Sequence, residues 1–430
     1  MTLPENHPQR FVINNEAHAR PSEPLKPPLS ISYIALFADA KDRDRDWEPL
    51  VELTQRHGMA PPAESSSHFS ADLGAFRLKW ERHTEFTRYT FMCEESRSAP
   101  FRTIAIEHVP EDWLVALPGQ IIVAAHAAYV LESDDARYDA IGQRYFGDKP
   151  IVGASVGGKA ATALTDFHIQ DDGFSRWLLL GGGMRPMQAG RTMQRLLEID
   201  TYRLMALLAL PVARDLAPFL AENERELASI TNAISDADVA EETNILDRLT
   251  RMEAAIEGRY VDNHYRFSAA SAYYDLVKRR IGELREERIS GLQTFREFTE
   301  RRLAPAMNTC VAAASRQEAL SRRVSRASQL LATRVSISQQ GQNQALLESM
   351  DQRARLQLRL QQTVEGLSVA AITYYVVGLI NYLTKGINSF GIAANANLIV
   401  AISIPVVLFA IAFGVRHIRR RVTDAKDRSA

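Results

Sequence analysis

The strongest hydrophobic signal in the chain lies near its C-terminus, where two long runs carry no charged residue. The first run, 366–384, is long enough at about 1.5 Å per residue to cross a hydrocarbon core of roughly 30 Å. The second extends from Ser389 to Val415, and 398–415 is the part expected in the bilayer. The pattern predicts a transmembrane hairpin over 366–415. A buried hairpin in a soluble core is the alternative, which the arginines directly after Val415 disfavour.

Basic residues flank both outer ends of this hairpin, whereas the loop between its helices carries only Lys385. Segments with an excess of lysine and arginine stay on the cytoplasmic side of a membrane. We therefore expect the lipid bilayer as one partner and both termini in the cytoplasm. The topology-setting residues are Arg353, Arg355, Arg359, Arg416, Arg419, Arg420 and Arg421.

A narrow apolar stripe precedes the first span. Apolar or small residues recur near heptad spacing from Leu320 to Val335 and again from Leu346 into Leu367. These repeats predict one long helix over 315–384, and a stripe on so long a helix needs a partner helix, in the same chain or in another subunit. The polar patch 336–344 interrupts the stripe and predicts either a register-setting layer or the lining of a hydrated channel.

The N-terminal part of the chain shows short apolar or alternating runs, which are typical of strands. The clearest run, 84–94, places Arg88 and Met92 on one face and Tyr89 and Phe91 on the other. We expect an α+β domain built on a largely antiparallel sheet. The expected strands are 30–37, 74–81, 84–94, 112–117, 120–131, 153–169 and 174–180.

The pattern changes to the helical period after residue 183, and Pro211, Pro218 and Pro305 are expected to kink or interrupt the helices. The expected helices before the stalk are 47–57, 191–210, 220–235, 237–257 and 268–310. The expected parts of the chain are a Pro-rich extended segment (1–30), the α+β domain (31–183), a helical region (184–314), the stalk (315–365), the hairpin (366–384 and 398–415) and a basic tail (416–430).

Composition excludes several classes of protein. The net charge is −1, so we expect no nucleic-acid partner. Cys93 and Cys310 lie far apart and in no metal-ligand pattern, which fits a reducing compartment. The N-terminus lacks the basic and apolar run of a signal peptide, so the hairpin itself is expected to direct insertion.

One motif resembles a phosphate-binding loop. Residues 153–160 read Gly-Ala-Ser-Val-Gly-Gly-Lys-Ala, but Ala160 replaces the hydroxyl residue that would bind Mg²⁺. The next residues predict a strand rather than the helix that holds phosphates. We therefore expect a glycine-rich strand or bulge. With scattered histidines and no catalytic pairing, we expect no enzyme, no metal site and no cofactor.

Polar residues share one face of the first span. Because polar groups facing lipid are costly, this face should contact protein or water, and helix packing and a hydrated path remain open. The face comprises Tyr374, Asn381, Thr384 and Asn388, with Gly378 beside it.

Four sequence segments resemble an uncharacterised bacterial family described as predicted membrane-anchored proteins. The resemblance covers the whole chain and implies an inner-membrane location, but no activity. It rests on 7–10 (His-Pro-Gln-Arg), 15–21 (Asn-Glu-Ala-His-Ala-Arg-Pro), 196–211 and 361–375.

The architecture also resembles the CorA family of divalent-cation channels, whose stalk helix runs into the first of two spans. The family signature is Gly-x-Asn at the end of that span, and Gly386 and Asn388 occupy its place. The resemblance implies that both lie at a channel mouth, with Mg²⁺ or another divalent cation as the transported ion. Lys385 stands where the family has an aromatic residue, and the loop has no acidic residue.

Two functional hypotheses follow. The first is a membrane-tethered scaffold or sensor, with a homo-oligomeric assembly and an unidentified cytoplasmic partner. The second is a CorA-like homo-oligomeric cation channel, which predicts a pore lined by the polar face of the first span.

Overall fold

The computed structural model describes residues 4–11, 13–14, 21–38, 43, 45–64, 66–94, 100–131, 138–147, 149–236, 239–389 and 396–427. The chain divides into two compact units. The first comprises Met1–Ala237 and Asn244–Gln329, and the second comprises Asp238–Thr243 and Leu330–Ala430.

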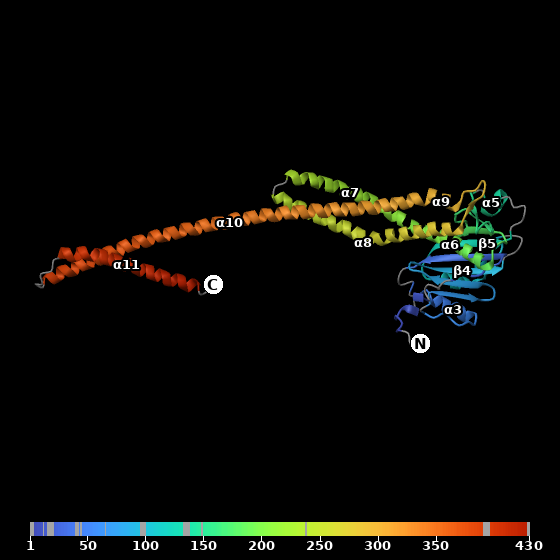
Figure 1. The fold of residues 1–430 in the computed structure, drawn as a ribbon, viewed down its shortest axis with the longest axis horizontal. Coiled ribbons are helices and arrows are strands. Elements are labelled where there is room, and N and C mark those ends of the chain that lie inside the picture. Colours follow the sequence, from blue (N-terminus) through green and yellow to red (C-terminus); the bar gives the residue numbers. More distant parts are fainter. Residues whose placement is uncertain are drawn as a thin grey trace. The chain divides into compact units, whose positions relative to one another are not determined.

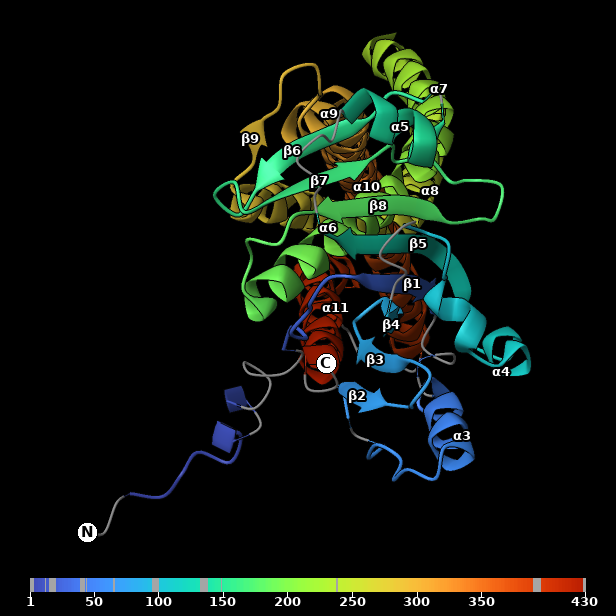
Figure 2. The ribbon, with the colours of Figure 1, turned by 90° about the vertical axis from the view of Figure 1, so that its right-hand side faces the viewer.

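A mixed sheet forms the centre of the first unit (Figure 2). Across the described residues its order is β2-β3-β4-β1-β5-β8-β7-β6-β9, and the neighbouring strands are antiparallel except β5 and β8, which are parallel. The predicted α+β class is confirmed. The strands are β1 (Leu29–Phe37), β2 (His68–Asp72), β3 (Arg77–Arg82), β4 (Phe86–Glu94), β5 (Gln120–Val130), β6 (Val152–Val156), β7 (Ala161–Thr165), β8 (Ser175–Leu180) and β9 (Glu287–Arg288).

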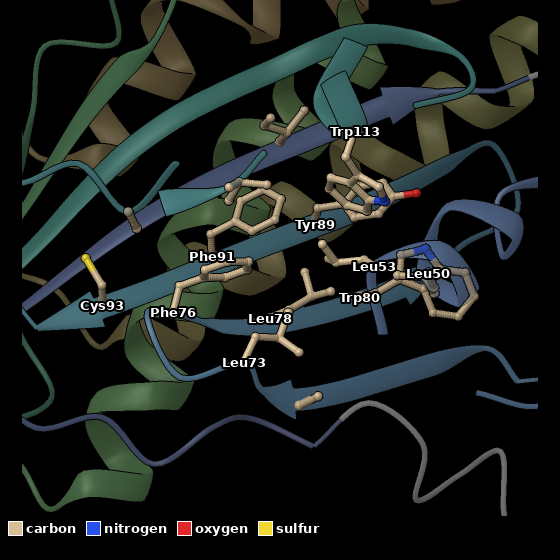
Figure 3. Close-up of a cluster of buried hydrophobic side chains, with 14 of the residues drawn as sticks. Leu50, Leu53, Leu73, Phe76, Leu78, Trp80, Tyr89, Phe91, Cys93 and Trp113 are labelled. Atoms are coloured by element: carbon tan, nitrogen blue, oxygen red, sulfur yellow. The ribbon is translucent and has the colours of Figure 1, made fainter. Parts of the chain in front are cut away.

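Alternation along the strands gives the sheet two faces of different character. On one face, Trp80, Tyr89 and Phe91 form an apolar core (Figure 3). Helices α3 (Glu48–Arg56) and α4 (Glu111–Val115) cover it, and the Trp113 indole donates to the Pro49 carbonyl over 2.6 Å. Large buried rings on every second position hold these short helices in place, because each ring loses much apolar surface from water.

Helix α6 (Pro186–Leu207) covers the opposite face, called here the α6 face. The predicted alternation of β4 is confirmed, since Arg88 and Met92 lie on this face while Tyr89 and Phe91 lie in the apolar core. The Tyr33 hydroxyl and the Thr201 hydroxyl on α6 are 2.7 Å apart. The α6 face is therefore mixed in polarity although it is buried.

The remaining helices of the first unit pack beside one another. Arg316 on α10 pairs with Glu224 on α7 at 2.8 Å, and Gln317 donates to the Ile256 carbonyl on α8 over 3.4 Å. Leu320 and Val324 on α10 are buried. The helices and short turns not yet bounded are η1 (Ala105–His108), α5 (Tyr138–Phe146), α7 (Ala209–Asp236), α8 (Val239–Leu284), α9 (Phe295–Arg302) and α10 (Ala304–Ser389).

Several sequence predictions about these elements are wrong, and the gap expected between the helices 237–257 and 268–310 lies inside α8. Residues 112–115 are helical instead of extended, because Pro110 precedes an acidic first turn that favours a helix N-terminus. The run 153–169 is two strands, since Gly157, Gly158 and Lys159 have positive φ and turn the chain between β6 and β7. The helix predicted over 268–310 is broken between α8 and α9, where Arg285 and Gly291 have positive φ and β9 joins the sheet.

The second unit contains the C-terminal part of α10, and α11 (Ala396–Asp427). Helix α10 is unbroken over 86 residues (Figure 1), so the prediction of one long helix is confirmed and its bounds are wider. By length and composition, three described helical stretches could cross a membrane: Pro186–Ile234, Phe295–Gly386 and Asn397–His417. The first stretch is the one that the sequence reasoning did not propose.

Candidate functional site

A cavity separates part of the sheet from α6. Its volume is about 40 Å³, which is room for a few water molecules. Apolar walls come from Ile31 on β1 and Leu197 on α6, and a polar wall comes from β3 and β4. The lining residues that bear on binding are Glu23, Tyr33, Lys79, Glu81, Arg88 and Thr90.

A line of alternating charges, the ionic chain, runs along this polar wall into the helices. The Arg88 guanidinium lies 2.5 Å from a Glu81 oxygen and 3.1 Å from a Glu198 oxygen. Glu198 also accepts from Arg280 on α8 over 2.5 Å. The ionic chain consists of Lys79, Glu81, Arg88, Glu198, Arg280, Glu283 and Arg195.

Burial makes the charge states of the ionic chain interdependent. Burial alone would raise the pKa of Glu198, but the charges of Arg88 and Arg280 outweigh it and hold that pKa below its ordinary value. Burial lowers the pKa of Lys79, and Glu81 opposes that shift. Removing one charged side chain of the ionic chain would leave its neighbour's charge buried and unpaired, in a protein interior that solvates charge poorly.

Lys79 keeps hydrogen-bonding capacity toward the cavity. Among the described residues, its ammonium has one ion-pair partner, Glu81, at 3.2 Å. An ammonium has three N–H donors, and Lys79 lines the cavity, so it can donate to a molecule bound there. Thr90 lines the same space. The cavity therefore offers donors beside an apolar wall, and its volume suits water or a ligand of only a few heavy atoms that carries an acceptor group.

The N-terminal segment closes one side of this cavity. Glu23 accepts from Ser70 over 2.7 Å and pairs with Arg77 at 3.1 Å, while the Leu25 amide donates to the Pro186 carbonyl over 3.0 Å. Gly190 on α6 allows the approach, since a Cβ there would lie 1.8 Å from the Glu23 carbonyl oxygen. This segment belongs to the predicted Pro-rich stretch, of which residues 4–11 and 13–14 are also described. Residues 15–20, in one of the quoted segments, lie outside the described residues.

The C-terminal helices place the polar residues predicted for the first span in different surroundings. Thr384 is buried, and its hydroxyl donates to the Ile380 carbonyl over 2.6 Å. Tyr374 is exposed, and it lines a groove between α10 and α11 together with Asn381 and Lys385. Gly386 is exposed, whereas the side chain of Asn388 lies outside the described part of the chain.

The basic residues predicted to set topology lie on the same two helices. Arg355 pairs with Asp351 on its own helix at 2.7 Å, with the arginine side chain largely exposed. Arg353 and Arg359 are exposed on α10, and Arg416 is exposed on α11. The side chains of Arg419, Arg420 and Arg421 are outside the described residues.

The phosphate-loop-like motif forms a turn between antiparallel strands. No helix follows it, and the Lys159 ammonium pairs with Glu287 at 3.3 Å. Where side chains are described, no cluster of three metal-ligating residues occurs. The ionic chain and its cavity were missed by sequence reasoning. The alternation of β4 signalled a buried arginine, but nothing local signalled its partner on α6.

Comparison with known proteins gives one match. A family model described as "Protein of unknown function (DUF3422)" matches residues 5–422. No curated protein and no solved structure matches the chain. The resemblance to the CorA family has no support from these comparisons and stays a prediction.

Proposed function

The chain belongs to the DUF3422 family over nearly its whole length, and we propose that it acts as a membrane-anchored scaffold or sensor. In this proposal α11 and the C-terminal part of α10 form the anchor. The first unit is the cytoplasmic binding module. Its cavity on the α6 face is the place for a small ligand.

Exposed apolar surface on the C-terminal helices carries the proposal. The apolar windows of Phe295–Gly386 and Asn397–His417 are 6% and 0% buried inside the protein. Leaving so many apolar side chains in water costs about 25 cal/mol per Å². A bilayer removes that cost, and both helices satisfy their own backbone hydrogen bonds, as a bilayer demands.

The apolar stretch Pro186–Ile234 has a different role. Its window is 33% buried, and its α6 part places Glu198 and Asp200 in ion pairs and hydrogen bonds within the protein core. We therefore assign it to the core of the first unit. The anchor has two spans, and the basic flanks then favour a cytoplasmic location for both termini at a bacterial inner membrane.

Alkaline carbonate extraction of bacterial membranes that contain the full chain tests the anchor. We expect the chain to stay in the membrane pellet. The double variant Ile402→Arg/Phe409→Arg should shift to the soluble or aggregated fraction, because each arginine costs about 2.5–3.5 kcal/mol at the centre of a span. The matched control Leu358→Arg, on an exposed stalk position, should remain in the pellet. Release of the unmodified chain by carbonate would overturn the proposal.

Thiol labelling of intact cells tests the topology. The native cysteines are buried and can be replaced by alanine. A membrane-impermeant maleimide should then label Lys385→Cys, near the C-terminal end of α10, and spare Thr423→Cys, near the end of α11, until the membrane is permeabilised. The reverse pattern would contradict cytoplasmic termini.

The groove between α10 and α11 favours the channel as a second candidate, since Tyr374 and Asn381 offer neutral oxygens to a hydrated cation. Lys385 lines the same groove and repels cations, so the anchor is preferred. Mg²⁺ flux into liposomes that contain the purified chain separates the two, with Asn388→Ala as the comparison variant. Flux that this variant abolishes would favour the channel. Absence of flux from well-folded protein would exclude the channel and favour the membrane-anchored scaffold or sensor.

A further inference from the structure

We propose that a second copy of this chain packs in parallel along one face of α10, from Leu346 to Gly378. This inference rests on the membrane anchoring proposed above and adds that the anchored chain binds a second copy of itself. The face, called here the stripe, consists of Leu346, Leu356, Leu360, Val364, Leu367, Ala371 and Gly378.

The stripe is a single face of an unbroken helix. At about 100° per residue, Leu346, Leu360 and Leu367 recur at multiples of seven positions and stay within about 60° of one another. Their side chains are 61%, 67% and 68% exposed. An exposed apolar row of this length on one helix face needs a partner of similar length.

The partner is not α11. Thr373 and Thr384 are buried, and with Val377 and Ile380 they recur at three- and four-residue spacing on the side of α10 that packs against α11. That side lies about 130° around the helix from the stripe. The hairpin therefore leaves the stripe uncovered in a single chain from Leu346 to Ala371, while Gly378 also borders the groove with α11.

The same helix already uses an apolar row for helix packing upstream. Leu320 and Val324 are buried in the first unit, where α10 packs beside α7 and α8. The row of apolar residues continues along α10 past the polar patch 336–344, but from Leu346 onward it is exposed. The apolar row that packs against α7 and α8 upstream thus continues into a segment of α10 where no helix of the same chain covers it.

Membrane anchoring selects a second copy as that partner. Two copies in one membrane enter it in the same direction and at the same depth, because α10 has no break between Leu346 and the span. Each residue of the stripe then meets its own counterpart. Confinement to the membrane raises the effective concentration of the two helices, as a linker does.

The residues along the stripe suit a parallel pair. Ala371 and Gly378 are small, so the helices can approach closely within the bilayer. Arg353 interrupts the apolar row one heptad after Leu346, and one polar residue at a core position fixes register and the number of strands. Tyr374 and Asn381 lie between the stripe and α11, in the groove between the two helices.

Cysteine cross-linking in bacterial membranes tests this face. In a chain whose native cysteines are replaced by alanine, Leu360→Cys lies on the stripe and Leu358→Cys lies about 160° away on the same turn. Both side chains are exposed in one chain. Under mild oxidation we expect at least fivefold more disulfide-linked dimer from Leu360→Cys. Equal or reversed yields would overturn the proposal.

The mass of the chain in nanodiscs, corrected for lipid, provides the second measurement. We expect a dimer or larger assembly, with the triple variant Leu346→Asn/Leu360→Asn/Leu367→Asn reduced to a monomer. The control pair Leu347→Asn/Leu358→Asn should keep the assembly. A monomeric unmodified chain that resists carbonate extraction would refute the stripe alone, whereas a chain that never enters the membrane would refute the anchor.

Discussion

Arg88 on β4 and Glu198 on α6 are 110 positions apart in sequence, and their side chains form an ion pair at 3.1 Å with both almost fully buried. Glu198 extends this pairing to Arg280 on α8. The sheet, α6 and α8 are thereby joined by charge as well as by apolar packing. A ligand that entered the cavity would contact Lys79 and Arg88, at the sheet end of this connection.

Arg88→Met should destabilise the first unit by about 3–5 kcal/mol, because the carboxylates of Glu81 and Glu198 would stay buried without their shared partner. Urea unfolding followed by tryptophan fluorescence measures the loss. The four tryptophans, at 47, 80, 113 and 177, all belong to the first unit, so the signal reports that unit.

Two comparisons separate the buried pair from a general effect of losing an arginine. Arg251→Met removes an exposed pair with Asp247 and should cost no more than about 0.5 kcal/mol. Adding Glu198→Gln to Arg88→Met should restore part of the loss. Equal costs for Arg88→Met and Arg251→Met would contradict the role assigned to the ionic chain.

His126 should make stability depend on pH. Burial lowers its pKa from 6.5 to about 4, with Asp172 opposing the shift, and its ring stacks on Phe174. Below about pH 6.5 the histidine binds a proton in the unfolded chain but not in the folded chain, so the free energy of unfolding falls as the pH drops toward 4. Below about pH 4 both states are protonated, and the loss due to His126 no longer grows. The full effect is on the order of 3 kcal/mol.

The difference between the chain and its His126→Gln variant isolates this effect from the carboxylates, which titrate in both. Urea midpoints measured between pH 7.5 and 4 should fall more steeply for the unmodified chain. Parallel pH profiles for the chain and His126→Gln would refute the prediction.

Gly190→Ala should loosen the N-terminal segment from α6, because the new Cβ would lie 1.8 Å from a backbone oxygen of Glu23. Hydrogen exchange of the Leu25 amide, which donates to the Pro186 carbonyl, should become faster. Gly258→Ala is the matched control, with nothing within 4 Å of its Cβ. It should stabilise α8 by about 0.5–1 kcal/mol and leave Leu25 exchange unchanged.

Ala160→Ser completes the phosphate-loop motif and should still give no binding of ATP with Mg²⁺ in calorimetry. The motif forms a turn between β6 and β7 and has no helix N-terminus to hold phosphates. Lys159→Ala should change stability by no more than about 0.5 kcal/mol, since its pair with Glu287 is exposed. Micromolar ATP binding by Ala160→Ser would overturn this interpretation of the turn.

Local patterns predicted the long elements of the fold well. Heptad-like spacing indicated α10, and Pro305 fits the first turn of that helix, where a missing N–H removes no hydrogen bond. Alternation in β4 separated the Arg88 face from the Tyr89 face. Each of these signals lies within one segment of the chain.

Features that depend on distant partners could not be read in this way. The pairing of Arg88 with Glu198 needs the register of β4 against α6, which neither segment encodes alone. The break after α8 depends on Arg285 in a left-handed conformation and on Glu286, whose carboxylate accepts from the Phe295 and Arg296 amides at the start of α9. The burial of Thr384, a residue of the polar face predicted for the first span, is likewise a feature of the folded chain that local spacing does not give.

The late position of β9 has a consequence for synthesis on the ribosome. Strand β6 pairs on one side with β7 and on the other with β9, which is translated only after α6, α7 and α8. Until then one edge of β6 offers unpaired backbone groups to any neighbouring nascent chain. The first unit can complete its sheet before the spans leave the ribosome. Chaperones that shield strand edges would therefore act on this chain before the insertion machinery does.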